Sequence, residues 1–167
     1  IMGHLEERDY YDYHVIPLFN KIFNLDIKGK EFSRGSYGFV SYRNEIRDAL
    51  IDLGFPKGKK SKIVKVPQQI LESRDFKIYG AFLRGLFDTD GNLYLRKSYV
   101  GTNKFKRSHN HYHLIRLVSI SKFLIEGVIK MLLDRDILFY YYCRDPKKLN
   151  ESREHFISIS GIDGLDR

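Results

Sequence analysis

Apolar residues at helical spacing run through residues 76–87 and stop at an acidic turn, Asp88-Thr89-Asp90-Gly91. The spaced positions are Phe76, Tyr79, Leu83, Leu86 and Phe87. This spacing predicts an amphipathic helix that buries one face against a second layer of structure. On another face Ala81 and Gly85 stand four residues apart, and such small residues either let a second helix approach closely or simply pack in a core.

The end of this helix suits a cation, because its last carbonyls are unsatisfied and carry the negative end of the helix dipole. The carboxylate of Asp90 and the backbone carbonyl of Thr89 predict an oxygen site for Mg²⁺. A calcium loop is excluded, because that pattern needs glycine at the sixth position and Gly91 is only the fourth residue of the turn. A plain Asp-Gly turn is the remaining alternative.

Hydrophobic patterns on both sides of the helix predict an α+β chain. Upstream they indicate a helix over 14–24, two strands within 29–42, a helix from Asn44 that stops at Gly54, and a helical turn near Ile70. Downstream they indicate strands over 92–98 and 111–121, a helix over 124–133, and strands over 137–144 and 154–160. Residues 15–43 echo 124–161, which favours a distal half-repeat in 1–74 and a fuller repeat in 75–167, with chance similarity as the alternative.

The charge balance favours a polyanionic partner. Lys and Arg number 29 against 21 Asp and Glu, giving a formal charge of +8 and a pI near 9.5. Nucleic acid is the leading candidate, and a merely soluble basic protein is the alternative. Cys143 is the single cysteine, which excludes an intrachain disulfide and a cysteine-based zinc site. No signal peptide or membrane span is indicated, so we expect an intracellular, cytoplasmic protein.

The segment Tyr79-Gly-Ala-Phe-Leu-Arg-Gly-Leu-Phe-Asp-Thr-Asp-Gly91 resembles the signature helix of LAGLIDADG homing endonucleases. The residues on signature positions are Leu83, Gly85, Leu86, Asp88, Asp90 and Gly91. The predicted element order, together with the run Gly-Lys-Lys-Ser at 58–61, extends this likeness over most of the chain. Within that family, the chain is similar to single-motif, archaeal-like members of the intron or intein type.

The resemblance implies the LAGLIDADG homing-endonuclease fold, an antiparallel sheet saddle on DNA with helices packed on one face. It implies that two motif helices meet through Ala81, Gly85 and Asp88. Each helix would bring its last acid, here Asp90, to a divalent metal such as Mg²⁺ at the scissile phosphate. Because one motif is present, we expect a homodimer that breaks both strands of a long, roughly palindromic DNA target in intron or intein homing.

A basic group near the phosphate would stabilise the charge that develops during hydrolysis. The catalytic candidates are Lys60 and Lys62, in the basic loop over 57–65, and Lys122, which follows the strand predicted over 111–121. Ser121 holds the position where relatives often place a polar residue, such as Gln, beside the metal water. For each lysine, a solvated surface charge is the alternative.

DNA contacts are expected from the predicted strands and from a second basic loop, which lies between the strands over 92–98 and 111–121. Asn92, Tyr94, Arg96 and Ser98 share one strand face by alternation. Arg116 shares its parity with apolar neighbours, which leaves a bulge open. The further candidates are Lys104, Lys106, Arg107, His111, His113, Ser119, Tyr140, Tyr142 and Arg144. Strand positions that merely face solvent are the alternative for about half of this set.

The main rival function is a non-cleaving nucleic-acid binder on the same fold, such as an RNA maturase or a transcription regulator. The presence of Asp90 favours the nuclease. A protein-interaction domain with an incidental Asp-Gly turn is a third hypothesis, and it leaves the formal charge of +8 unexplained.

Overall fold

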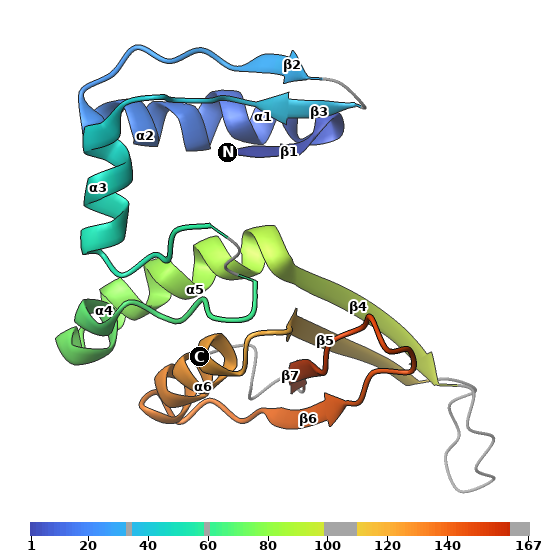
Figure 1. The fold of residues 1–167 in the computed structure, drawn as a ribbon. Coiled ribbons are helices and arrows are strands. Elements are labelled where there is room, and N and C mark those ends of the chain that lie inside the picture. Colours follow the sequence, from blue (N-terminus) through green and yellow to red (C-terminus); the bar gives the residue numbers. More distant parts are fainter. Residues whose placement is uncertain (33–34, 59–60, 99–109, 161–167) are drawn as a thin grey trace, which may run out of the picture. The chain divides into compact units, whose positions relative to one another are not determined.

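The computed structural model describes residues 1–32, 35–58, 61–98 and 110–160. The chain divides into two compact units, residues 1–50 and 51–167 (Figure 1). This boundary lies earlier than the predicted one at 74, because the intervening segment packs with the second unit and Val66 is only 2% exposed in its core. Within the described ranges, every helix is too short or too polar to cross a lipid bilayer.

Unit 1, residues 1–50, places helices beside a three-stranded antiparallel sheet with the order β1-β3-β2. In chain order its elements are β1 (Met2–His4), a 3-10 turn (Leu5–Glu7), α1 (Arg8–Tyr10), a π-helical turn (Tyr11–Val15), α2 (Ile16–Phe23), β2 (Lys30–Phe32), β3 (Ser36–Gly38) and α3 (Asn44–Asp52), the last of which crosses the unit boundary. The two strands predicted within 29–42 are confirmed. Strand β1 was not predicted.

The helical run of unit 1 starts at Leu5, well before the predicted residue 14. Its π-helical turn ends just before Pro17, which has no N–H to bond to the carbonyl of Tyr13, and this missing bond accounts for the wider turn. Asn24 ends α2 with a left-handed backbone (φ 50°). One core cluster of this unit consists of the buried side chains of Tyr11, Ile16, Tyr37 and Phe39.

Unit 2, residues 51–167, packs helices on a four-stranded antiparallel sheet with the order β4-β5-β7-β6. Its further elements are α4 (Gln68–Ser73), α5 (Phe76–Asp90), β4 (Gly91–Ser98), β5 (Asn110–Ser119), α6 (Lys122–Leu133), β6 (Tyr140–Arg144) and β7 (Glu154–Ser160). The predicted order of a helix, two strands, a helix and two strands is therefore confirmed, and the fold class is α+β.

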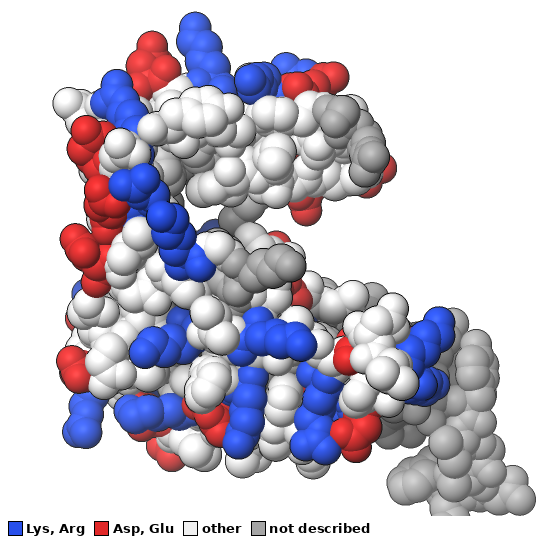
Figure 2. All heavy atoms as spheres, viewed as in Figure 1, with Lys and Arg blue, Asp and Glu red and all other residues white. Residues whose placement is uncertain are grey.

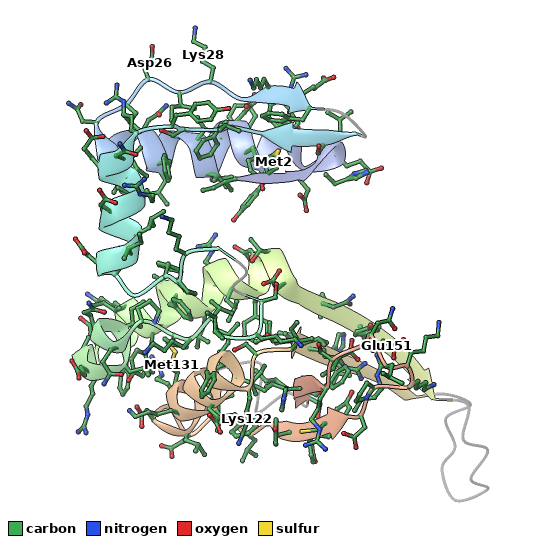
Figure 3. All side chains as sticks on the ribbon, viewed as in Figure 1. Met2, Asp26, Lys28, Lys122, Met131 and Glu151 are labelled. Atoms are coloured by element: carbon green, nitrogen blue, oxygen red, sulfur yellow. The ribbon has the colours of Figure 1, made fainter. Side chains whose placement is uncertain are left out.

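The core of unit 2 lies between the sheet and the helices α5 and α6. Tyr79 on α5 is 1% exposed, and Met131 on α6 is fully buried. Figure 3 shows Met131 between α6 and the α4–α5 pair. The sheet contributes odd-numbered residues, Leu117 from β5 and Ile157 from β7, so one face of the sheet is the helix side.

Unit 1 repeats the connectivity of the distal part of unit 2. In unit 1, β1 leads through a helical run to β2 and β3, in the sheet order β1-β3-β2. In unit 2, β5 leads through α6 to β6 and β7, in the sheet order β5-β7-β6. The helix and the two strands that follow it thus stand in the same topological relation to the preceding strand in both units.

Candidate functional site

The acidic end of α5 is built by local geometry. The N–H of Gly91 donates to the carbonyl of Phe87, and a Cβ at position 91 would overlap that same carbonyl, so the close approach requires glycine. The hydroxyl of Thr89 lies 3.1 Å from the carbonyl oxygen of Gly85 and 3.2 Å from that of Leu86. These contacts hold the last turn of the helix in place.

The two acids of this turn have different surroundings. Asp88 forms a 3.7 Å ion pair with Arg84, one turn earlier on the same exposed side of α5. Asp90 is exposed, and among the described residues its carboxylate has neither a hydrogen bond nor an ion pair. Asp90 is therefore the carboxylate of this turn that is available to a ligand.

The donor set at this helix end fits a magnesium ion that is shared with a substrate. Mg²⁺ in phosphate-processing sites is held by one or two carboxylates and keeps waters and phosphate oxygens as its other ligands. Asp90 offers one carboxylate, and the carbonyl of Thr89 lies at the negative end of the helix. Within the described residues no group of three or more His, Cys, Asp or Glu side chains forms a closed metal cage.

The predicted contact face of α5 is exposed within unit 2. Ala81, Gly85 and Asp88 are all exposed, while the core side of the helix carries Phe82, Leu83, Leu86 and Phe87. A Cβ placed on Gly85 would meet no described atom within 4 Å. The small-residue face is thus free to receive another helix.

Ser121 has a structural position that sequence reasoning did not foresee. It is fully buried. Its hydroxyl donates to the carbonyl of Val64 at 2.5 Å and accepts from the N–H of Leu124 at 3.4 Å, which caps α6. Because the hydroxyl already donates one hydrogen bond, accepts another and is closed to solvent, it does not fit a catalytic role. We assign Ser121 instead to holding the segment around Val64 in place.

Of the described candidate lysines, one precedes this anchored segment in sequence and the other begins α6. Lys62 is exposed and lies two residues before Val64, without an ion-pair partner among the described residues. Lys122 begins α6, where its ammonium lies 3.3 Å from Glu126; Figure 3 labels its position. No ion pair joins either lysine to Asp90 in the described part of the chain. Lys60 lies outside the described residues.

The even-numbered residues of the sheet form a second face, which no described helix of unit 2 covers and which we call the open face. Cross-strand pairing aligns one row across all four strands, Asn92 opposite Arg116, Arg116 opposite Ser158, and Ser158 opposite Tyr140. Partners in register point to the same side of a sheet. The predicted contact residues with described side chains on this face are Asn92, Tyr94, Arg116, Tyr140, Tyr142 and Arg144.

No bulge is present at Arg116. Residues 114–119 pair continuously with β7. The apolar residues that share the parity of Arg116 also lie on the open face, where Val118 is 36% exposed. The guanidinium carbon of Arg116 lies 5.0 Å from the ring centroid of Tyr94. The open face is therefore a mixed surface of aromatic, aliphatic and basic side chains, as a nucleic-acid interface often is.

The β6 end of the open face is also aromatic and charged. The ring of Tyr142 stacks on Phe156 with centroids 4.6 Å apart and planes at 3°. The Nε of Arg144 donates to Glu154 at 2.8 Å. Residues at the end of β6 and in the loop that follows it line a cavity of about 470 Å³, with basic side chains such as Lys147 and acidic ones such as Glu151. Figure 2 shows the same mixture of basic and acidic side chains on the visible side of unit 2.

Several predicted contact residues are not on the open face. Ser119 pairs with His155 and accepts a hydrogen bond from the N–H of Ser121 at 3.0 Å, and His113 is likewise odd-numbered, so both belong to the helix side. Alternation along a strand does not tell which of its two faces is covered by helices, so only the sheet register separates Ser119 and His113 from the open face. Their contact with DNA stays a prediction. The side chains of Arg96, Ser98 and His111, and the whole of Lys104, Lys106 and Arg107, lie outside the described part of the chain.

Sequence reasoning missed the contribution of β7. Phe156 and Ser158 lie on the open face between β5 and β6. The alternation that singled out Asn92 and Tyr94 also runs through residues 154–160, so the signal was present.

A second polar cluster lies on the helix side of the β6 edge. The hydroxyl of Tyr141 lies 2.8 Å from Nδ1 of His155 and 3.0 Å from Sγ of Cys143. The hydrogen bond with Cys143, together with burial, raises the pKa of Tyr141 to about 12. The phenol therefore stays protonated at neutral pH and serves as a hydrogen-bonding group.

Comparison with known proteins agrees with this arrangement. The family model described as a LAGLIDADG-like domain matches residues 77–162, from the start of α5 to the end of the sheet. The chain belongs to the LAGLIDADG family. Members of this family generally bind DNA, and the domain is typical of endonucleases.

One curated relative is the probable translation initiation factor IF-2 of Methanocaldococcus jannaschii. It is 29% identical over 152 residues, a match that covers 86% of this chain and 12% of that protein. The LAGLIDADG chain thus spans only a small part of the relative's length. The two proteins share this segment, and nothing about translation follows for the chain described above.

Proposed function

We propose that this LAGLIDADG protein is a site-specific endonuclease that makes a double-strand break in DNA by metal-dependent phosphodiester hydrolysis. The observation that carries the proposal is Asp90, an exposed carboxylate without a described partner at the end of the signature helix. A purely structural turn has no need for an acid that is left unpaired at the negative end of a helix.

In this mechanism the open face binds the duplex and the end of α5 meets the scissile phosphate. A bound Mg²⁺ supplies a Lewis acid that activates water and stabilises the leaving oxygen. Asp90 and the carbonyl of Thr89 would hold it. Lys62, close in sequence to the anchored Val64, and Lys122 at the start of α6 are the described cations proposed to stabilise the phosphate charge, and Lys60 is proposed with them.

Cutting both strands needs two acidic helix ends. We propose that a second copy of the chain supplies the other end, in a twofold dimer that packs the Ala81–Gly85 faces of α5 together. Asp88 would lie at the edge of that contact, beside Arg84. A twofold dimer favours a long and roughly palindromic DNA target.

Intron or intein homing is the biological role that this activity supports best. The matched segment is 12% of a relative whose name refers to translation, which is the arrangement expected of an element inserted into an unrelated host protein.

The test compares cleavage by the wild type, Asp90→Asn and Asp88→Asn on a plasmid library with Mg²⁺, with breaks mapped by sequencing. We expect Asp90→Asn to lose cleavage by at least about a hundredfold, because a catalytic carboxylate is removed. It should still bind DNA, and that binding should weaken steeply with added salt as counterions are released. Asp88→Asn is the comparison variant, because it removes the other acid of the turn, which is proposed to lie at the dimer edge and not at the metal. At protein concentrations that keep the dimer assembled, it should retain most of its cleavage.

A wild type that binds DNA tightly but never cuts would contradict the nuclease proposal. It would favour a non-cleaving transcription regulator on the same fold. Tighter binding to structured RNA than to duplex DNA would favour a maturase.

A further inference from the structure

We propose that Arg116 and Ser158 form a base-reading subsite for guanine at the centre of the open face. This inference rests on the proposed binding of duplex DNA and adds a specificity-determining pair to it. Arg116 comes from β5 and Ser158 from β7, and the two residues are direct partners in the sheet register.

The first observation is an unsatisfied polar pair. Among the described residues, the buried side-chain N and O atoms without a hydrogen-bond partner are Nε of Arg116 and Oγ of Ser158. Ser158 is only 5% exposed. Buried polar groups in folded proteins are nearly always paired, so two adjacent exceptions on one face indicate that their partners come from a ligand.

The second observation is the position of the arginine side chain. The guanidinium of Arg116 rests against the ring of Tyr94, with its carbon 5.0 Å from the ring centroid. Tyr94 belongs to β4, so the arginine is supported from one neighbouring strand and lies beside Ser158 on the other. Both Nε of Arg116 and the hydroxyl of Ser158 are closed to solvent in the structure, so the inferred subsite requires the Arg116 side chain to move when a ligand binds.

The chemistry of this pair fits a base edge better than a phosphate. A guanidinium presents parallel N–H donors, and in the major groove guanine presents N7 and O6 as adjacent acceptors. The hydroxyl of Ser158 adds a short donor or acceptor for the same or the neighbouring base. The pair lies on the two central strands, whereas phosphate contacts suit basic residues toward the edges, such as Arg144 on β6.

The test measures base discrimination separately from affinity. Full-length wild type and variants select from a randomised duplex pool, and binding is then measured for the selected duplex and each single base-pair change. Arg116→Lys should lose about tenfold to a hundredfold of the preference for guanine at one position per protomer. Ser158→Ala should relax the same position or its neighbour. The urea midpoint of each variant reports folding.

Arg144→Lys is the matched control, because it makes the same substitution at an arginine of the open face that already pairs with Glu154. It should weaken binding evenly across sequences. If Arg116→Lys also weakens binding evenly and leaves the preference profile unchanged, the pair contacts phosphate and the subsite is overturned. If the wild type binds no duplex in the pool, the proposed DNA-binding function fails together with the subsite.

Discussion

At the scale of single residues, one network ties the motif helix to the rest of unit 2. The hydroxyl of Tyr79 lies 2.9 Å from the carbonyl oxygen of Leu71 and 3.1 Å from Asp134, and the ammonium of Lys130 lies 3.1 Å from the same carboxylate. The hydrogen bond from Lys130, and also that from Tyr79, holds the pKa of Asp134 below its usual value. Asp134 therefore connects α5 to the end of α6 in its ionised form.

This connection predicts a pH-dependent effect of Asp134→Asn. Since the folded-state pKa is lowered, the carboxylate stabilises the fold above its unfolded-state pKa, and this contribution is lost as the pH falls through the folded-state pKa. Asp134→Asn should therefore lower the urea midpoint at neutral pH, and the difference from wild type should shrink in acid. Glu126→Gln, which removes only an exposed pair within α6, is the control. An equal deficit at both pH values would contradict this account.

At the scale of elements, the segment before α4 is fixed to α6 at two points. The hydroxyl of Ser121 bonds the carbonyl of Val64, and Val66 packs against Gly127, where an added Cβ would lie 2.9 Å from the Cβ of Val66. The chain between Lys62 and α4 is therefore held against the first half of α6. Ser121 therefore supports the site by holding this segment in place, not by taking part in catalysis.

Ser121→Ala tests this anchoring. It removes both the α6 cap and the partner of a partly buried carbonyl, so we expect a loss of about 1–2 kcal/mol in the free energy of unfolding. Urea denaturation measures this loss. Ser119→Ala, which removes only one acceptor nearby, should cost less. A catalytic Ser121 would instead reduce cleavage without changing stability, and that result would restore the original assignment.

At the scale of the whole molecule, the exposed face of α5 predicts self-association. Gly85→Leu should weaken dimerisation by about 1–3 kcal/mol, because a large side chain blocks the close approach of two helices. Sedimentation velocity measures the change. Gly80→Leu is the matched control, since Gly80 also has open space around it on α5 but lies on a different side of the helix. Equal effects of both variants, or a monomeric wild type, would contradict the homodimer.

The repeated connectivity of unit 1 bears on the same question. We propose that residues 1–50, which include β1, β2 and β3, correspond to the distal half of a second LAGLIDADG-type repeat, as the sequence echo between 15–43 and 124–161 suggested. Residues 1–50 hold no second signature sequence, so the proposed source of the second acidic helix end is still a second copy of the chain.

The sequence by itself determined most elements and the chemistry of the motif. Periodicity places α5 from Phe76 to Asp90, close to the expected start and stop, because a helix buries a stripe that local spacing specifies. Alternation likewise grouped Asn92 with Tyr94. These properties depend on neighbours along the chain, so they can be predicted without a structure.

Only the tertiary structure decided which face of the sheet is open, where Ser121 points, and where the first unit ends. Each depends on pairing between residues far apart in sequence, such as Ser121 with Val64 or Arg116 with Ser158. A strand's alternation is the same whichever face is buried, and a serine before a helix looks the same whether its hydroxyl meets water or a carbonyl. The packing of α5 and α6 on one side resolved both ambiguities.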